Sequence, residues 1–545
     1  MRRLGIDTCR EPVAYLRADS EVCRSEGFGA RARIALNRGR RQVVATVNVV
    51  AAPLLEEHEI GLSEAAWHAL EGEPGAAVLV AHPAPLQSFA AVRAKIYGRP
   101  FSAAALGRDF DVDQGSAPAR SPIMAHERTL RRALAQQRTA MPMLQSHQLL
   151  VINAGSSSIK FALYAAPQGA RPLWRGAITD IGGSASTLAV EGPPGLSCSR
   201  RFPIPESVTA AQVLRDWLLD HLAPPALQAI AYRVVYGGPA CCAVRAIDSA
   251  LLAELYQGAS CQPEHLPQEL HLIEMLRRDF PAAAHLACFD SSFHATMPLR
   301  AAMLPIPRHY HARGVRRYGF HGLSCAWLMR ELARVAGPQA ASGKTVIAHL
   351  GGGASVTAVQ DGRSCDTTMG LTPAGGIMSG TRSGDLDPGL GWYLSRREQM
   401  TVAGFQRMVN QESGLLGISG TSGNLRTLLA LQESDSRADE AVDMFCYQVR
   451  KAIWAMAGAM DGIDTLIFSG GIGAHAGPVR ERICAGLGSL GVTLAAPGQP
   501  GGELVSAATS AVAVWVMESN EEAIIAEQAH AWLGLPAAQG EPSHA

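Results

Sequence analysis

The sequence predicts an α/β protein built from several domains. At three places in the chain, apolar and β-branched strands run directly into turns of glycine and serine. Other stretches have apolar residues at three- and four-residue steps, which is the period of an amphipathic helix. The chain has 545 residues, of which 47% are apolar, so it is long enough to form more than one hydrophobic core.

The first hundred residues predict a small α+β unit, which we bound at residues 1–105. Strand-like composition is found in residues 6–17, 32–36 and 42–50. Helical periodicity follows in residues 63–70 and 88–97. Residues 106–147 then predict a linker of prolines, serines and arginines, in which the basic stretch favours a tether over a short solvated helix.

The three strand-and-turn segments favour phosphate binding. Residues 149–164, LLVINAGSSSIKFALY, predict two strands joined by a turn rich in N–H groups, hydroxyls and one ammonium, although Gly-Ser turns also join ordinary hairpins. Residues 346–359, VIAHLGGGASVTAV, repeat this design with three glycines that allow the backbone to approach an oxyanion. Residues 466–473, LIFSGGIG, predict a third strand and glycine loop, where a flat ring can lie against bare backbone. Their order and spacing favour a nucleotide site.

A helix is predicted at residues 439–460. Its apolar stripe, which we interpret as core and not as a cofactor face, consists of Val442, Phe445, Val449, Ile453 and Met456. Asp461 and Gly462 end the helix ahead of a strand at residues 465–468.

The composition excludes some classes of function. The 48 basic and 48 acidic side chains give a formal net charge of zero, so nucleic acid is not an expected partner. No apolar run reaches the length of a membrane span, and the N-terminus lacks the apolar core of a signal peptide. Eleven cysteines without a CxxC pair are typical of reduced thiols. We therefore expect a cytoplasmic protein that does not bind a membrane.

A set of short motifs identifies the larger part of the chain. From about residue 148 to about residue 535 the sequence resembles the acetate kinase family, through NAGSSSIKF, YRVVYGG, CFDSSFHATMP, RRYGFHG, AHLGGGASV, DTTMGLTP, GTRSGDLDP, ESGLLGISG, FSGGIG and SNEEA. The resemblance implies a duplicated ribonuclease H-like core of the actin and sugar kinase superfamily, and a homodimer. Lobe one would span residues 148–300, joined by a C-terminal helix at 521–535, and lobe two would span residues 301–520.

The resemblance also implies a reaction, the reversible transfer of a phosphoryl group from ATP to acetate with Mg²⁺ or Mn²⁺, giving acetyl phosphate and ADP. Such a transfer needs cations and hydrogen-bond donors placed in advance. Acetate is already ionised at neutral pH, so no general base is required. The matching positions give four catalytic residues, Arg233, Asp290, His294 and Arg382. The alternative for His294 is a histidine satisfied by a backbone carbonyl.

The other site residues are likewise implied by the resemblance, in three groups. The acid would be bound by Arg233, Val235, Phe293 and Pro373. The metal would be held by Asn153 and Glu521. The nucleotide would contact Lys160, His349, Leu350, Gly351, Gly352, Gly353, Asn424, Leu425, Arg426, Gly471, Ile472 and Gly473. We interpret His321 as structural or as a supporting neighbour of the site.

Some positions depart from the family pattern. Gly352 replaces the asparagine of HLGNG, and Ala474 and His475 replace the polar pair of GIGEN. Glu264 replaces an apolar residue and would repel a carboxylate if it faced the acyl pocket. Two alternatives therefore stay open: a kinase for another short acid, propionate or butyrate, and a weakened nucleotide-binding regulatory protein.

The leading unit resembles a different family. Residues 1–105 are similar to the N-terminal part of thymidine phosphorylase and AMP phosphorylase, through LGIDTCREPVAYLRADSEVCRSEGF, ATVNVV, GLSEAAW and VRAKIYG. The match stops near residue 98, before the region where that family keeps its phosphate and nucleoside residues. Phosphorolysis is therefore not expected, and the resemblance implies an oligomerising or docking role.

Overall fold

The structure is a computed structural model, and it describes residues 1–81 and 148–534 with internal gaps. The gaps are residues 7–11, 18–19, 21–32, 40, 51–54, 57, 156, 166–170, 184, 194–196, 223–226, 239–241, 260–265 and 497–503. The chain forms two compact units, residues 1–136 and 137–545, which we describe separately. The helix predicted at 88–97, the linker at 106–147 and Glu264 lie outside the described residues. The domain boundaries proposed from the sequence stay predictions.

The first unit contains a six-stranded sheet in the order β1-β5-β2-β4-β3-β6. Its strands are β1 Arg2–Arg3, β2 Val13–Arg17, β3 Arg33–Arg38, β4 Arg41–Val50, β5 Gly61–Leu62 and β6 Leu79–Ala81. Helix α2, Glu64–Ala69, starts at Ser63, whose hydroxyl accepts the Ala66 N–H and so caps the helix. Trp67 of this helix packs on a core that includes Leu16 and Leu36. Strands β2, β3 and β4 and helix α2 lie in or next to the segments where the sequence predicts them, whereas β1, β5 and β6 were not predicted.

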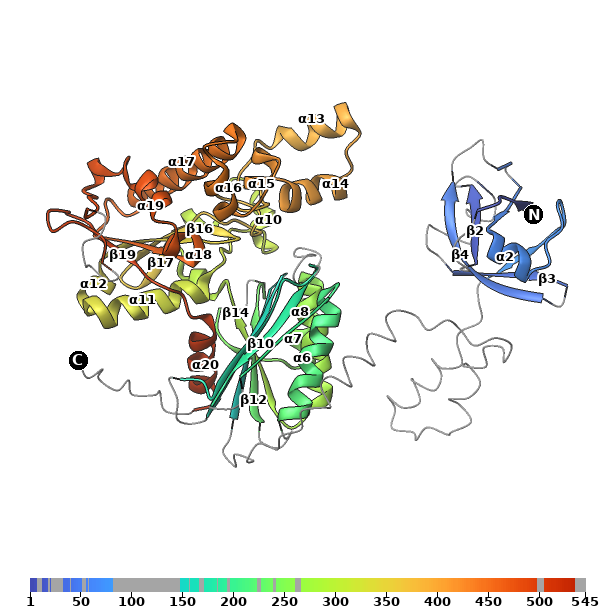
Figure 1. Ribbon diagram of the computed structural model, residues 1–545, viewed down its shortest axis with the longest axis horizontal. Coiled ribbons are helices and arrows are strands. Elements are labelled where there is room, and N and C mark those ends of the chain that lie inside the picture. The colour runs from blue at the N-terminus through green and yellow to red at the C-terminus, as the bar shows by residue number, and fades with distance from the viewer. Residues whose placement is uncertain are drawn as a thin grey trace. The chain divides into compact units, whose positions relative to one another are not determined.

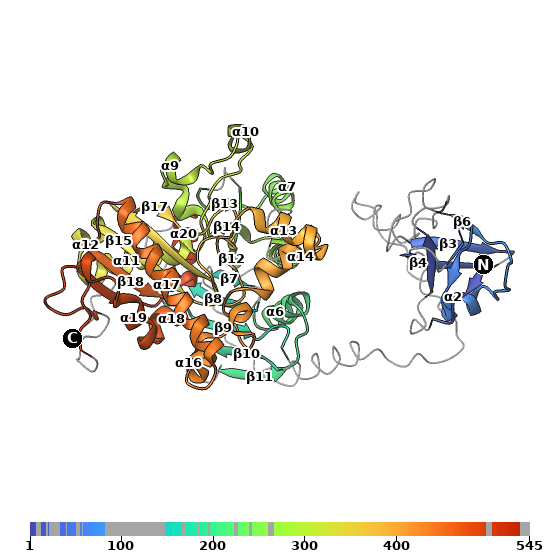
Figure 2. The same ribbon diagram turned by 90° about the horizontal axis from the view of Figure 1, so that it is seen from above.

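The second unit contains two sheets, of which the first has eight strands in the order β11-β10-β9-β8-β7-β12-β14-β13. The strands are β7 Gln148–Ala154, β8 Ile159–Ala165, β9 Trp174–Thr179, β10 Ser186–Glu191, β11 Cys198–Phe202, β12 Leu227–Val234, β13 Arg245–Ala246 and β14 Ala284–Phe289. Helices α6 Ser207–His221, α7 Ser249–Gly258 and α8 Leu266–Asp279 lie on one side, and α20 Glu521–Trp532 lies on the other (Figure 1). Viewed from above, the strands from β14 to β11 form one row (Figure 2).

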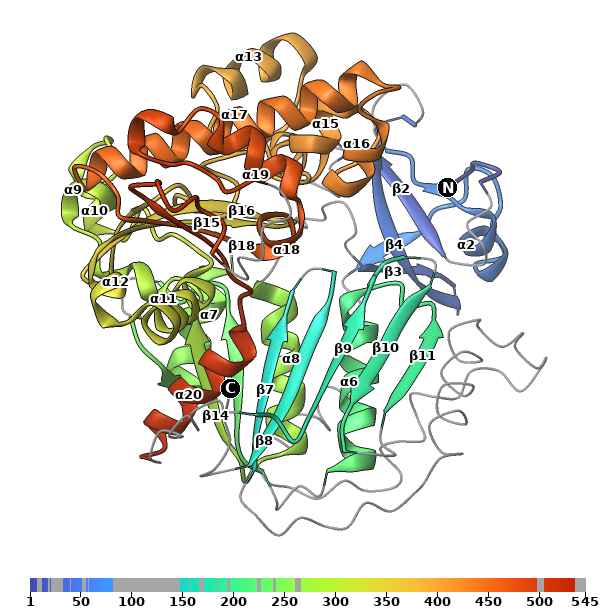
Figure 3. The same ribbon diagram turned by 60° about the vertical axis from the view of Figure 1, so that its left-hand side comes forward.

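The second sheet has five strands in the order β17-β16-β15-β18-β19. The strands are β15 Lys344–Leu350, β16 Ala354–Gln360, β17 Arg363–Thr367, β18 Thr465–Ser469 and β19 Ala513–Val516. Its pairing repeats that of the first sheet. β7 and β15 each pair antiparallel with the next strand, and each pairs parallel with a later one, β12 or β18. The core is therefore duplicated, with mixed α/β sheets in both halves (Figure 3).

Two helices cover the two faces of this second sheet. Helix α17, Ser436–Ala459, buries the predicted stripe from Val442 to Met456 against it. Helix α11, Gly322–Ala336, packs on the opposite face through Leu328 and Leu332. The remaining α-helices are α9 Leu299–Ala302, α10 Arg308–Ala312, α12 Pro338–Ser342, α13 Gly389–Glu398, α14 Val402–Arg407, α15 Gly414–Ser419, α16 Leu425–Leu431, α18 Gly470–His475 and α19 Gly477–Cys484. Among the described residues, no helix has the length and apolarity needed to cross a membrane.

Candidate active site

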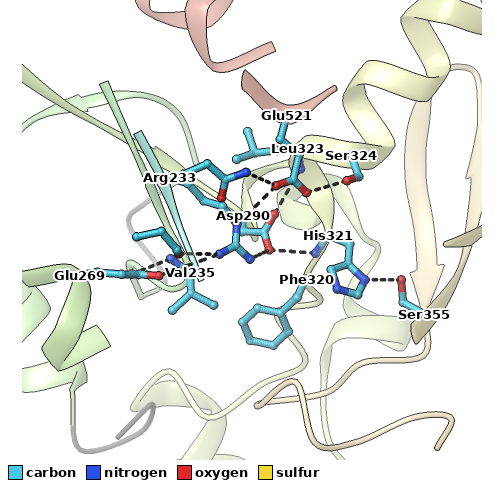
Figure 4. A network of polar contacts seen from close by, with 12 residues as sticks. Arg233, Val235, Glu269, Asp290, Phe320, His321, Leu323, Ser324, Ser355 and Glu521 are labelled. Atoms are coloured by element: carbon cyan, nitrogen blue, oxygen red, sulfur yellow. Dashed lines mark hydrogen bonds and ion pairs between the residues drawn. The ribbon is translucent and has the colours of Figure 1, made fainter. Parts of the chain in front are cut away.

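The site begins where two parallel strands end. Arg233 is the second-last residue of β12, and Asp290 directly follows β14, its neighbour in the sheet. Because parallel strands end at one edge, the two side chains meet, and Arg233 Nη2 donates to Asp290 Oδ2 at 2.8 Å. Asp290 is fully buried and also accepts the N–H groups of His321 at 3.1 Å and Leu323 at 3.4 Å. A guanidinium and the first turn of α11 therefore fix this carboxylate (Figure 4).

Glu521 approaches Arg233 from α20. Its Oε2 accepts a hydrogen bond from Asn153 Nδ2 at 2.8 Å, and its Oε1 accepts one from Ser324 Oγ at 2.6 Å. Arg233 Nε has no hydrogen-bond partner among the described residues, but it lies 3.8 Å from Glu521 Oε2. The two predicted metal ligands, Asn153 and Glu521, are thus in contact with each other, and Glu521 lies beside the guanidinium.

A third carboxylate near Arg233 was not predicted from the sequence. Glu269 on α8 is only 4% exposed. Its Oε2 accepts the Val235 N–H at 3.0 Å, and its Oε1 lies 4.0 Å from Arg233 Nη1. Burial raises the pKa of Glu269 to about 7, although Arg233 and the Val235 N–H act in the opposite direction. The sequence does hold a signal, because this acidic residue stands in an apolar stripe with Leu266 and Ile273.

The three carboxylates stabilise the charged form of Arg233. Burial alone would lower the pKa of Arg233, but Asp290, Glu521 and Glu269 together raise it above its ordinary value. The guanidinium therefore stays charged although its side chain is only 15% exposed.

His321 and Arg382 meet at the second glycine turn. His321 precedes α11 with a φ of +60°, and its Nδ1 hydrogen-bonds with Ser355 Oγ at 3.0 Å. A Cβ at position 353 would lie 3.1 Å from Arg382 Nη1 and 3.2 Å from His321 Nε2, so both side chains reach the Gly353 backbone. The His321 ring lies 4.6 Å from the ring of His349, and burial lowers the pKa of both histidines. This geometry favours including His321 in the site.

Glycine-rich backbone from four segments converges next to these side chains. The Gly380 N–H donates to the Gly352 carbonyl at 3.3 Å, and a Cβ at position 380 would lie 2.9 Å from the Gly423 carbonyl. A Cβ at Gly351 would lie 3.9 Å from the Gly471 nitrogen. The turn after β15, the segment of Gly380, the segment before α16 and the start of α18 therefore share one backbone surface.

The third glycine segment differs from the predicted loop. Gly471, Ile472 and Gly473 belong to helix α18, which begins directly after β18. Gly470 makes this abrupt transition possible, because its φ is +75° and a Cβ there would lie 2.5 Å from the Leu350 carbonyl. A run of small residues after a strand does not by itself distinguish a loop from a helix start.

Two predicted nucleotide residues have side chains that face away from this surface. Leu350 and Leu425 are buried in the core of the second sheet, so only their backbone groups can reach a ligand. Asn424 is the N-cap of α16, and its Oδ1 accepts the Arg426 N–H at 3.0 Å. Asn424 and Arg426 are both exposed.

Lys160 lies at a pocket of about 790 Å³ that is lined by β8, β9, β10, α11 and the start of α20. Ala474 and His475 also line it, whereas Arg233 and Arg382 are not among its lining residues. The pocket reaches Glu522, whose Oε1 accepts a hydrogen bond from Asn153 Nδ2 at 2.9 Å.

His294 and Phe293 have contacts that differ from their predicted roles. His294 is fully buried, and its two ring nitrogens contact Ser364 Oγ at 2.9 Å and the Phe320 carbonyl at 3.0 Å. Burial lowers the pKa of His294 to about 4. These contacts correspond to the alternative of a histidine satisfied by a carbonyl, and the catalytic role stays a prediction.

The apolar wall beside Arg233 is built by other residues. Phe293 packs against the cluster under α11, whereas Val235 packs with Phe320 and Met369. The contacts therefore favour Phe320 over Phe293 for the wall of an acid pocket. Pro373 is partly buried in the segment that follows β17, and its predicted role stays a prediction.

Comparisons with known proteins show the family of the larger part of the chain. The model of the acetokinase family matches residues 148–527. The chain belongs to the acetokinase family. An acetate kinase of Rhodopseudomonas palustris is 39% identical over 398 residues, covering 71% of this chain and 98% of that protein. A propionate kinase of Escherichia fergusonii is 36% identical, covering 70% of this chain and 95% of that protein.

Solved structures of the acetokinase family are similar over the same region. The crystal structure of a propionate kinase from Francisella tularensis has a TM-score of 0.64 at 31% identity, covering 70% of this chain and 98% of that one. That of Porphyromonas gingivalis acetate kinase has a TM-score of 0.62 at 31% identity, covering 71% of this chain and 100% of that one. Residues 148–527 are therefore an acetokinase domain, whereas the phosphorylase resemblance of the leading unit is untested.

Proposed function

We propose that this chain transfers a phosphoryl group from ATP to acetate, reversibly, giving acetyl phosphate and ADP. The observation that carries the proposal is that two guanidinium groups from distant segments both approach His321. Arg233 is the second-last residue of β12, and Arg382, between β17 and α13, reaches Gly353 after β15. His321 lies between the two segments, since its N–H donates to Asp290 and its Nε2 faces Gly353. A migrating phosphoryl group needs cations in such an arrangement.

The acid would bind at Arg233. Val235, Phe320 and Met369 form an apolar cluster next to this guanidinium, which suits the short alkyl group of the acid. The carboxylate needs no proton removed before it attacks, so the role of Arg233 is to bind and orient it. Asp290 holds Arg233 and the backbone of His321 in place from behind.

The nucleotide phosphates would bind along the glycine backbone from Gly351 to Gly353, with Arg382 and His321 beside them. The Mg²⁺ or Mn²⁺ of the family reaction would be held by Glu521 and Asn153. Their oxygens fit such an ion, because Mg²⁺ takes one or two carboxylates and completes its shell with water and phosphate. When bound, the ion neutralises charge on the phosphates.

A hydroxamate assay with ATP, Mg²⁺ and acetate tests this proposal. We expect hydroxamate from the unaltered chain and a loss of about 10²- to 10³-fold in kcat for Arg382→Lys, because lysine cannot reproduce the donor fork. Arg397→Lys, at an exposed position on α13, is the matched control and should retain full activity. No hydroxamate from the unaltered chain with any acid would contradict the proposal and favour the nucleotide-binding regulatory protein.

A second candidate is a kinase for propionate. Relatives named propionate kinase are 34–38% identical to this chain, which is close to the values for relatives named acetate kinase. Comparing kcat/KM for acetate, propionate and butyrate decides between them. One methylene in an apolar pocket changes the ratio by roughly 10- to 200-fold. A propionate value above the acetate value would replace acetate as the assigned substrate.

For residues 1–105 we propose an assembly role, on the basis of their resemblance to the leading part of thymidine phosphorylase. The acetokinase region itself is expected to form a homodimer. Deleting residues 1–110 and measuring the particle mass by light scattering tests the first point. A truncated chain with the same number of subunits as the full chain would reject the assembly role.

A further inference from the structure

We propose that Glu269 is a positioning and specificity residue of the acid site, which anchors the segment 233–235 and whose negative charge competes with the substrate carboxylate for Arg233. This inference rests on the proposed function, because it requires a short carboxylic acid at Arg233. It assigns to α8 a part in substrate selection.

The geometry links Glu269 to both acid-binding residues. One oxygen accepts the Val235 N–H at 3.0 Å, just past the end of β12, and the other lies 4.0 Å from Arg233 Nη1. Within the described part of the chain, the one hydrogen bond of Arg233 Nη1 is a long one of 3.5 Å to the Ala154 carbonyl. Nη2 is already taken by Asp290. Nη1 is therefore held only by this long hydrogen bond among the described residues, and Glu269 faces it.

The local charge balance makes Glu269 a competitor. With Glu269 ionised, Arg233 has three anionic neighbours, since Asp290 and Glu521 also face it. A substrate carboxylate would be a fourth anion, and like charges at this separation in a partly buried site repel strongly. With Glu269 protonated, only two anions remain, and the substrate can take its place at the guanidinium.

Charged groups elsewhere on α8 do not offset this effect. Arg215 of α6 pairs with Asp279 at the far end of α8, and Tyr256 of α7 hydrogen-bonds with Glu274. The ordinary structural role, a carboxylate that merely caps the Val235 N–H, would also be filled by glutamine. The two roles therefore differ in their dependence on charge and pH.

The sign of the pH effect follows from this competition. The substrate carboxylate is ionised throughout the neutral range. Acid binding is therefore strongest where Glu269 is protonated, and it weakens as the pH rises through about 7. A rise in pH also favours the neutral forms of His321 and His349, which would likewise weaken the binding of an anion. A variant of Glu269 is therefore needed to show that Glu269 causes the pH dependence.

The test is an NMR titration of the full-length chain with sodium acetate at pH 6 and pH 8.5, following broadening of the acetate methyl signal. We expect the Kd of the unaltered chain to be about tenfold weaker at pH 8.5. In Glu269→Gln the pH dependence should fall to about twofold or less, with tighter binding at pH 8.5 than in the unaltered chain. Glu274→Gln, the same change at an exposed position of α8, should behave as the unaltered chain.

Each outcome decides the inference. An equal pH dependence in the unaltered chain and Glu269→Gln overturns it, and so does a failure to bind acetate. If Glu269→Gln does not fold, the unaltered chain still decides, because acetate binding that is independent of pH overturns the inference without any variant. A chain that makes no hydroxamate but binds acetate with the expected pH dependence would refute the proposed reaction and support the role of Glu269. In an active enzyme, the KM for the acid should change while the KM for ATP does not.

Discussion

Replacing Glu269 by glutamine should stabilise the second unit above neutral pH and not at pH 4.5. Burial raises the pKa of Glu269 in the folded chain, so below the unfolded pKa both states are protonated and the carboxyl carries no penalty. As the pH rises from about 4.5 to about 7, the unfolded chain releases this proton more readily than the folded one. Stability is therefore lost over this interval and stays lost above it. Glutamine has the same shape but carries no titratable proton, so the variant should not lose stability over this interval.

The magnitude follows from the two pKa values. The folded value is about 7 and the ordinary value is 4.5, and each pH unit corresponds to about 1.36 kcal/mol. The penalty at pH 8 is thus about 3 kcal/mol, and because Glu269 is only 4% exposed, solvent screens little of it. For a unit of this size, with an unfolding entropy of about 2 cal/mol/K per residue, this corresponds to about 4 °C in Tm.

The assay is thermal unfolding followed by tryptophan fluorescence, because Trp174 and Trp217 lie buried in the same half of the unit as Glu269. The Tm of Glu269→Gln minus that of the unaltered chain should rise by about 4 °C between pH 4.5 and pH 8. Glu274→Gln should show no such rise. A difference between Glu269→Gln and the unaltered chain that is the same at both pH values would refute the reasoning.

Three further predictions concern the remaining site residues. Arg233→Met should lower the free energy of unfolding by about 3–5 kcal/mol, because Asp290 then keeps a buried charge without its partner. Adding Asp290→Asn should restore at least half of this loss. If the losses of the two single variants add up in the double variant, the pairing is contradicted. Gly353→Ala should lower kcat at least about tenfold, since the methyl would lie 3.1 Å from Arg382 Nη1. Gly352→Ala should not lower kcat, because the space around Gly352 is open. Equal kcat values for the two variants would count against a site at Gly353. Gly352→Asn should lower the KM for ATP by about three- to tenfold by supplying a donor to the phosphates, and an unchanged KM would show that this position does not reach them.

Local sequence patterns correctly predicted two hairpins and one long helix. The hairpin of β7 and β8, and that of β15 and β16, follow from apolar strands separated by short turns. Helix α17 follows from its apolar stripe, and it begins at Ser436, earlier than the predicted residue 439, because Asp435 caps it. A capping residue seven positions before Val442, where the stripe begins, is a weak signal beside the periodicity.

These local patterns do not predict contacts between segments that are distant in the sequence. The resemblance to a family placed Arg233 and Asp290 in one predicted site. The parallel register of β12 and β14 is the physical reason that the two side chains meet. The ring contacts of His294 depend on Phe320 and Ser364, which lie far from it in sequence. Sequence reasoning missed Glu269 because the guanidinium that it faces, that of Arg233, lies on β12 and not on the same helix.

The three carboxylates around Arg233 have different exposures, and Glu521 is the most exposed of them. Asp290 is fully buried and Glu269 is 4% exposed, whereas the side chains of Glu521 and Arg233 keep 19% and 15% of their surface. The side of the guanidinium that faces Glu521 therefore keeps some accessible surface. On that side a cation held by Glu521 would also offset one of the negative charges facing Arg233. Metal and acid binding should then be coupled, with acetate binding more tightly when Mg²⁺ is present, and the extra affinity should be lost in Glu521→Gln. Equal acetate affinities with and without Mg²⁺ would show that the two sites are independent.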